Sequence, residues 1–400
     1  MPSRYLNFRC SVPWLILLLQ TLFLSCFFFG FGVGDINSSL DSYPELQDVI
    51  HMLIFGFGFF LMVLRRYGFS STGFNFLLIV LGVQCSVLLE YLFIFLVEQE
   101  NEAGAVVSMT AVVISTGAVL GKANPVQLIV MTLVELIVFY VSRYINMTFL
   151  KVQEHLILMH VHLFGAYFGL ALSSCFPEPP PGLDKNRSTP KSDLFSVLGA
   201  VFVWVYWPSF SSILAYIKVK AVLSASLALT VSAVAAFMLS ALTSKDGKFR
   251  MSHIRSAVLA GGVTVASTEH LIQHPWIAMI LGLLGSVITI LGSHCLQRCF
   301  NPALKLQDTS GVHFTFGLPA VLGAVACVVL HVVEEGTETQ LNDLSSVGYL
   351  IFYDVGAFCQ TISTALITGF ITGLILNIKL LKAVHVSKYF DDQFYWEVSF

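Results

Sequence analysis

Residues 221–244 read AVLSASLALTVSAVAAFMLSALTS and contain no Asp, Glu, Lys or Arg. A helix needs about 20 mainly apolar residues to cross the hydrocarbon core of a bilayer, and this stretch is long enough to do so. Uncharged stretches of similar length recur at 11–34, 67–89, 271–297 and 309–333. Residues 221–244 are therefore one of a series of predicted transmembrane helices.

The composition of all 400 residues indicates the same class. Apolar residues make up 56% of the chain and charged residues 11%, and the mean hydropathy is +0.80. A soluble protein needs a charged shell over its core, and so few charges cannot form one. Disordered chains are polar and poor in aromatic residues, so this composition excludes a disordered chain. The net charge of −3 gives no indication of a nucleic-acid partner, and none is predicted. The sequence predicts an all-α polytopic protein of the lipid bilayer.

Division at the polar breaks predicts about twelve spans. They cover 11–34, 49–64, 70–97, 104–120, 125–146, 154–176, 195–217, 220–244, 251–268, 272–295, 312–333 and 347–378. Basic residues gather in alternate connections, at 4–9, 65–66, 122, 185–191, 245–250, 298–305 and 379–388. The positive-inside rule then predicts short cytoplasmic termini at 1–10 and 379–400. Lys218, Lys220, Arg143 and Lys151 are exceptions to this pattern.

The chain is predicted to be one membrane domain over 1–400, with a cytoplasmic linker at 177–193 between two bundles of helices. The first span is expected to be a retained signal anchor. Asn37, in an acidic outer loop, begins an Asn-Ser-Ser glycosylation motif. Cys295 and Cys299 resemble a metal-binding pair in spacing only, so no metal site, cofactor or disulfide framework is predicted.

Ionisable residues inside predicted spans are candidates for function, because they are costly to bury. They are Glu90, Glu135, Glu154, His162, His313 and Asp354. Glu154 and His162 are eight positions apart on one helix face, about 12 Å along the axis. This pair suits a pore in which the carboxylate recruits cations at the entrance and the imidazole, deeper on the same side, accepts or donates protons. A snorkelling Glu and a packed His fit the spacing equally well.

No motif typical of an enzyme occurs in the chain, which predicts a protein that is not an enzyme. A more informative feature is internal similarity. HLFGAYFG at 162–169 recurs in pattern as FGLPAVLG at 316–323, about five spans later. An odd displacement reverses the direction through the membrane and indicates an inverted five-helix repeat, in which His162 and Phe316 face each other at the midplane.

Six strings resemble the Rh branch of the ammonium transporter/Rh superfamily. They are AVLGK at 118–122, HLFGAYFGL at 162–170, WPSF at 207–210, SAVLAGGV at 256–263, GVH with GLP at 311–319, and KYFDDQ at 388–393. The tail, which continues as FYW, looks most like the erythroid Rh blood-group polypeptides and not the Rh glycoproteins. The resemblance implies an ammonium-transporter-like fold of eleven or twelve spans and a trimer with one pore per subunit.

The resemblance also implies roles for single residues. Glu154 stands where an acidic residue precedes the pore, and His162 matches the first of two pore histidines. Phe210 matches one ring of an outer gate, whose partner falls near Val107. Phe316 replaces the second pore histidine, and His313 is retained three residues earlier.

The loss of one imidazole matters, because paired imidazoles offer ammonium a proton acceptor and a proton path, whereas a phenyl ring offers neither. The sequence therefore predicts weak or absent conduction, in a subunit of a plasma-membrane Rh complex such as that of the erythrocyte. The resemblance implies Rh glycoprotein partners and an ankyrin-linked cytoskeleton at the tail. The alternative is an active channel for ammonia, ammonium or carbon dioxide.

Overall fold

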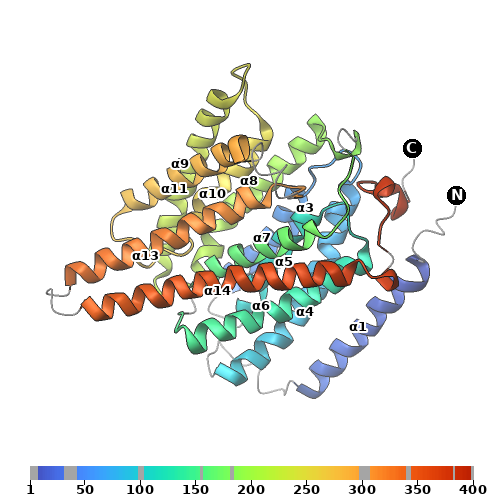
Figure 1. Cartoon of the computed structure of the whole chain (residues 1–400), viewed down its shortest axis with the longest axis horizontal. Helices are drawn as coiled ribbons and strands as arrows, with labels where there is room; N and C mark the ends of the chain where they lie inside the picture. The colour runs from blue at the N-terminus through green and yellow to red at the C-terminus, as the bar shows by residue number, and fades with distance from the viewer. Residues whose placement is uncertain are drawn as a thin grey trace.

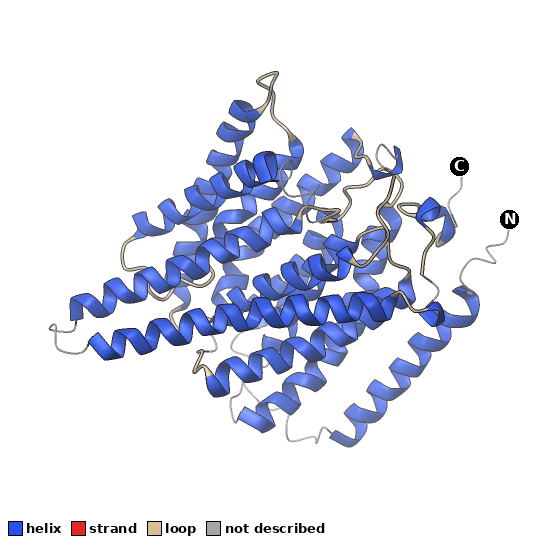
Figure 2. Ribbon diagram, in the orientation of Figure 1, coloured by secondary structure: helices blue, strands red, loops and turns tan. Residues whose placement is uncertain are grey.

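The structure is a computed structural model of the whole chain, and it describes residues 8–30, 43–97, 103–153, 156–180, 184–296, 307–338, 344–381 and 383–397. These residues form helices and connecting loops, and no strand occurs among them (Figure 2). The all-α fold class is therefore confirmed. Asn37 and Glu154 lie outside the described residues.

The helices follow the predicted spans closely. They are α1 (Phe8–Gly30), α2 (Tyr43–His51), η2 (Met52–Phe57), α3 (Gly58–Phe60), α4 (Gly68–Val97), α5 (Ala103–Val119), α6 (Pro125–Phe149), α7 (Ile157–Ser174), α8 (Pro190–Ser212), α9 (Lys218–Thr243), α10 (Met251–Val265), α11 (Pro275–Leu291), η5 (Gly292–Leu296), η6 (His313–Gly317), α13 (Leu318–Glu338) and α14 (Leu344–Leu376). Short 3₁₀ turns occur at η4 (Asp184–Asn186), η7 (Lys379–Leu381), η8 (Val386–Lys388) and η9 (Asp392–Phe394).

Nine of the described helices are long and apolar enough to cross a membrane. The continuous segment α2–η2–α3 and the shorter helices α5 and α10 occupy the remaining predicted spans. α1 begins at the same end of the bundle as the short helices near the C-terminus (Figure 1). A chain that crosses the membrane an even number of times has both ends on the same side, which agrees with this arrangement.

Local sequence explains where individual helices begin. Asn124 and Thr189 each precede a proline and accept a hydrogen bond from the backbone N–H three positions later. Gln127 and Ser192 at those positions bond back to the capping residue, which completes a capping box at both helices. Proline at the first helical position loses no bond there, because that N–H has no partner within the helix.

Small residues set how closely the helices pack. A methyl group on Gly261 would collide with the backbone oxygen of Ala228 on α9, and one on Gly262 would meet the Trp207 indole at 2.5 Å. A methyl group on Gly369 of α14 would meet the backbone oxygen of Phe168 on α7 at the same distance of 2.5 Å. Such contacts replace the hydrophobic effect between helices in lipid, where van der Waals packing drives association.

Two of the strings that carry the family resemblance meet at one end of the bundle. The N–H of Phe390 donates to the oxygen of Gly121 at 3.0 Å, and Gly121 has a positive φ of 79°. Asp392 accepts from the N–H groups of Phe69 and Ser70, at 2.9 and 2.8 Å, and so caps α4. The tail motif therefore holds the chain end against the membrane helices.

The structure explains three exceptions to the positive-inside rule. The Arg143 guanidinium contacts the Glu90 carboxylate at 2.7 Å, and both side chains are buried. Lys218 bonds Glu45 at 2.8 Å, and this hydrogen bond lowers the pKa of the Glu45 carboxyl. Lys220 donates to the oxygen of His270 at 2.6 Å. The charges of Arg143 and Lys218 are compensated locally, whereas Lys151 is exposed and remains an exception.

Candidate functional site

The middle of the bundle brings His162 on α7 and Phe316 in η6 face to face. Their ring centroids lie 6.1 Å apart, with the planes 12° from parallel. Both side chains are fully buried. The π-helical turn η6 carries Phe316 immediately before α13, and such turns are frequent at functional sites.

Further rings extend this contact into one cluster, which we call the aromatic plug: Phe57, Phe60, His162, Trp207, Phe210 and Phe316. Phe57 and Phe60 contact Phe316 at centroid distances of 5.8 and 6.0 Å. On the other side, Trp207 and Phe210 contact His162 at 5.4 and 5.8 Å. All six side chains are fully buried, so the rings fill the space between α7, α8, α3, η2 and η6.

The two nitrogens of His162 have different surroundings. Nδ1 lies 2.5 Å from the backbone oxygen of Leu158, one turn earlier on α7. A carbonyl can only accept, so Nδ1 carries a proton and donates it to this bond. Nε2 is buried and has no hydrogen-bond partner among the described residues. It is therefore the atom of the plug that could accept a proton from a solute.

Two cavities lie at opposite ends of α10. One, of about 260 Å³, is bordered by Gln153, Lys220 and Glu269, and we call it the Glu269 cavity. The other, of about 550 Å³, is bordered by Arg250, Arg255 and Asp308 among others, and we call it the Arg255 cavity. Gly262, between the two ends of α10, contacts Trp207 of the plug. The plug therefore lies between the two cavities along this helix.

A positive charge lies against the plug on the side of the Arg255 cavity. The Arg255 guanidinium carbon is 5.2 Å from the centroid of the Phe60 ring. Its Nη2 donates to the oxygen of Ser310 at 2.8 Å, and its buried Nε has no hydrogen-bond partner in the described chain. The contact is of the cation–π type, which keeps a fixed cation beside the aromatic rings.

The predicted site residues do not all meet. His313 contacts Tyr167 and Phe314, at centroid distances of 5.8 and 5.1 Å, and no ring contact joins it to His162 within the described residues. Val107 is fully buried on α5 and brings no second ring to Phe210. Of the predicted pore residues, the structure thus brings together His162, Phe210 and Phe316.

Three other ionisable residues predicted inside spans have partners away from the plug. Glu90 accepts from Arg143 and from the Tyr140 hydroxyl, the latter at 2.6 Å. Glu135 accepts from the Ser115 hydroxyl at 2.5 Å, and Asp354 lies 2.6 Å from His331. These carboxylates are not part of the plug.

The structure adds Phe57, Phe60, Trp207, Arg255 and Glu269 to the site. Arg255 could have been found, because it is an ionisable residue inside the predicted span 251–268. Glu269 follows the end of that span by one position. Phe57 and Phe60 carry no such signal, because the chain contains 34 Phe and most are ordinary apolar residues of a span.

Known proteins resemble this chain over nearly its whole length. The family model described as Ammonium Transporter Family matches residues 14–392. An RH-like protein of Macaca mulatta is 39% identical over 99% of this chain and 98% of its own length. The blood group Rh(D) polypeptide of Rattus norvegicus is 38% identical over the same shares.

Solved structures agree with this. The structure of Nitrosomonas europaea Rh50, from the Rhesus protein family of channels, has a TM-score of 0.74 at 26% identity, over 89% of this chain and 91% of that one. A Sensor Amt Protein has a TM-score of 0.66 at 17% identity, over 87% and 94%, which shows a shared fold. The arrangement of helices is that of these proteins.

Proposed function

The chain belongs to the Rh branch of the ammonium transporter family, and on this premise we propose that it is an Rh-type membrane subunit whose own pore conducts ammonia weakly or not at all. Under this proposal the aromatic plug occupies the conduction path. The Glu269 cavity is the outer entrance, and the Arg255 cavity is the inner one.

One observation carries the proposal: Phe316 stacks on His162 and also packs against Phe57 and Phe60. Ammonium has to give up its proton or keep its hydrogen bonds to pass an apolar constriction. His162 Nε2 can accept one proton, but the opposite wall offers only phenyl faces, which cannot pass a proton on. Solute would also have to displace packed rings, which interiors resist.

Arg255 supports the same conclusion for the charged form of the solute. Like charges a few ångströms apart repel by several kcal/mol where water is scarce. Because Arg255 lies against Phe60, ammonium leaving the plug on that side would approach a fixed cation. The two features act on different species, the packed rings on ammonia and the guanidinium on ammonium.

An active channel for ammonia, ammonium or carbon dioxide is the second candidate, and the buried Nε2 of His162 favours it. Together with the unpartnered carboxylate oxygen of Glu269, it leaves an acceptor on the Glu269 side of the plug. Glu154 keeps its proposed role in cation recruitment.

We further propose a plasma-membrane protein with cytoplasmic termini, assembled as a homotrimer or a heterotrimer with Rh-type subunits such as an Rh glycoprotein. The distribution of basic residues supports the orientation, and the family supports the assembly. The tail at 379–400 is the proposed contact for an ankyrin-linked cytoskeleton, in the erythrocyte as for the blood-group relatives. Cross-linking in native membranes followed by mass spectrometry would identify the partners.

The function is tested by stopped-flow fluorescence on proteoliposomes in an ammonia gradient. We expect alkalinisation of vesicles that contain the protein at nearly the rate of protein-free vesicles. Rapid alkalinisation that disappears in the His162→Ala variant would overturn the non-conducting assignment and establish the channel.

A further inference from the structure

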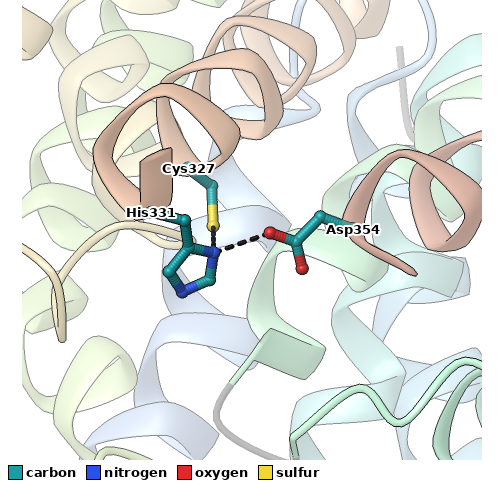
Figure 3. Close-up of side chains that lie close together, drawn as sticks. All are labelled: Cys327, His331 and Asp354. Atoms are coloured by element: carbon teal, nitrogen blue, oxygen red, sulfur yellow. Dashed lines mark hydrogen bonds and ion pairs between the residues drawn. The ribbon is translucent and has the colours of Figure 1, made fainter. Parts of the chain in front are cut away.

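Three side chains of the types that commonly bind metals converge between α13 and α14 (Figure 3). None of them belongs to the aromatic plug. Cys327 and His331 lie one turn apart on α13, and Asp354 lies on the adjacent helix α14. Their ligand atoms are all within 4.8 Å of one another. Residues four positions apart share a helix face, so α13 presents the sulfur and the imidazole to α14 together.

The contacts centre on one atom, Nδ1 of His331. It lies 2.6 Å from Oδ2 of Asp354 and 4.0 Å from Sγ of Cys327 (Figure 3). Cys327 is buried, and the side chains of His331 and Asp354 are 16% and 10% exposed. An ion could therefore reach the group from one side while the sulfur stays shielded.

The imidazole of His270 lies close enough to serve as a fourth ligand. The imidazole of His270, in the turn that follows α10, has its centroid 5.5 Å from that of His331. The His270 backbone oxygen accepts from Lys220 at 2.6 Å, which holds this turn in place. Rotation of the ring would complete a set of one sulfur, two nitrogens and one oxygen, and otherwise water takes the fourth position.

We propose that Cys327, His331 and Asp354 form a binding site for a thiophilic divalent cation of the Zn²⁺ class, with His270 or water as the fourth ligand. Thiolate, imidazole and carboxylate are the ligands that Zn²⁺ takes in proteins. Thiolate and carboxylate together carry two negative charges, so the loaded site is neutral. Neutrality matters between membrane helices, where an unbalanced charge is costly.

Binding releases protons in a defined way. The metal–sulfur bond forms as the Cys327 thiol gives up its proton, and the metal–nitrogen bond forms as the proton that Nδ1 shares with Asp354 leaves this nitrogen, so that the bound imidazole is neutral with its one proton on Nε2. Donor atoms around tetrahedral Zn²⁺ are roughly 3.3–3.6 Å apart. The carboxylate would therefore withdraw by roughly 0.7 Å and the sulfur approach by roughly 0.4 Å from the positions seen here. Side-chain rotations of this size leave the helices in place.

The test uses the purified full-length protein in lipid nanodiscs, treated with chelator and then titrated with Co²⁺ as a spectroscopic probe. We expect about one equivalent to bind, with a thiolate-to-cobalt charge-transfer band in the near ultraviolet, and Zn²⁺ to bleach it. Saturation without a thiolate band would reduce the group to an Asp–His ion pair beside a core cysteine, and would overturn the proposal.

Single-residue variants show which side chain gives rise to the thiolate-to-cobalt band. Cys327→Ser should abolish it, while Cys359→Ser, an exposed cysteine on the same helix as Asp354, should leave it unchanged. Asp354→Asn should retain the band and weaken binding by at least about 10–100-fold, the loss that removal of a partner behind a ligand already causes. A band that survives in Cys327→Ser contradicts the site.

A second measurement does not depend on the folding of any variant. In the unmodified protein, Zn²⁺ should slow alkylation of Cys327 and leave that of Cys359 unchanged, as read by mass spectrometry of each peptide. Equal alkylation of Cys327 with and without Zn²⁺ would also overturn the proposal. Both readouts are independent of conduction, so neither outcome bears on the proposed function.

Discussion

The buried polar groups of this protein fall into two sets that differ in their partners. Away from the aromatic plug, Glu90 pairs with Arg143 at 2.7 Å and Asp354 with His331 at 2.6 Å. Near the two ends of α10, by contrast, Arg255 and Glu269 have no ion-pair partner among the described residues: Arg255 Nη2 donates to the oxygen of Ser310, and Glu269 Oε1 is buried without a hydrogen-bond partner. Both sets lie in the same bundle of helices and face the same cost of burial.

The difference lies in access to water. Glu269 and Arg255 each border a cavity, of about 260 and 550 Å³, and water there can hydrate a charge that the protein leaves unpaired. The cavity beside Arg143 is much smaller, about 10 Å³, and there Glu90 accepts hydrogen bonds from Arg143 and from the Tyr140 hydroxyl. Paired groups hold the helices together, whereas under the proposed function the groups without an ion-pair partner border the two entrances of the conduction path.

The largest expected effect is on the paired set. Arg143→Gln leaves the buried Glu90 carboxylate without its cation and should lower the free energy of unfolding by about 3–5 kcal/mol. Thermal unfolding in detergent measures it. The double variant Glu90→Gln/Arg143→Gln removes both charges and should recover most of the loss. A single variant as stable as the double one would show that the pair is not a unit.

The next effect concerns the plug between the unpaired groups. Phe316→His restores a second imidazole opposite His162, and ammonia uptake should rise at least about tenfold, which is about 1.4 kcal/mol in the barrier. Stopped-flow uptake into proteoliposomes measures it. Phe316→Leu is the matched control, since it removes the ring and adds no titratable group. If Leu raises uptake as much as His, then steric packing alone limits conduction.

Substitution of a group without an ion-pair partner should change the free energy of unfolding only slightly. Glu269→Gln keeps the shape of the side chain and breaks no ion pair, so the free energy of unfolding should change by about 1 kcal/mol or less. Comparison of its thermal unfolding with that of Arg143→Gln tests the division directly. A loss as large as that of Arg143→Gln would mean that Glu269 has a structural partner and that the two sets do not differ.

The smallest effect is expected at an exposed pair. Lys218→Gln removes the partner of Glu45, and because the Lys218 side chain is 42% exposed, the loss should be roughly 0.5 kcal/mol or less. The pKa of Glu45 is lowered in the folded protein, so its contribution is present above the unfolded value of roughly 4.3 and is lost as pH falls through the lower folded value. Unfolding at pH 7 and pH 3 should therefore differ less in Lys218→Gln than in the unmodified protein.

The length of the uncharged apolar stretches predicted the all-α membrane fold and about twelve spans, and the comparisons confirmed the predicted family. The near repeat at 162–169 and 316–323 also indicated that His162 and Phe316 should be opposed, and their rings lie 6.1 Å apart. The contact of His313 was less predictable, because the π-helical turn η6 alters the direction of each side chain by a fraction of a turn. The exceptions Lys218 and Arg143 became understandable only with their partners in view.

Length and apolarity by themselves determine that the helices cross a bilayer, because in lipid each helix satisfies its own backbone hydrogen bonds without help from its neighbours. Length and apolarity do not determine which side chains become neighbours. Phe57 and Phe60 are 256 and more positions from Phe316, and Cys327 and His331 meet Asp354 only because α13 and α14 pack side by side. Contacts between distant segments decide which rings pack together in the plug and whether a carboxylate lies beside the imidazole and the thiol. Those contacts follow from helix packing, and only the tertiary structure decided them.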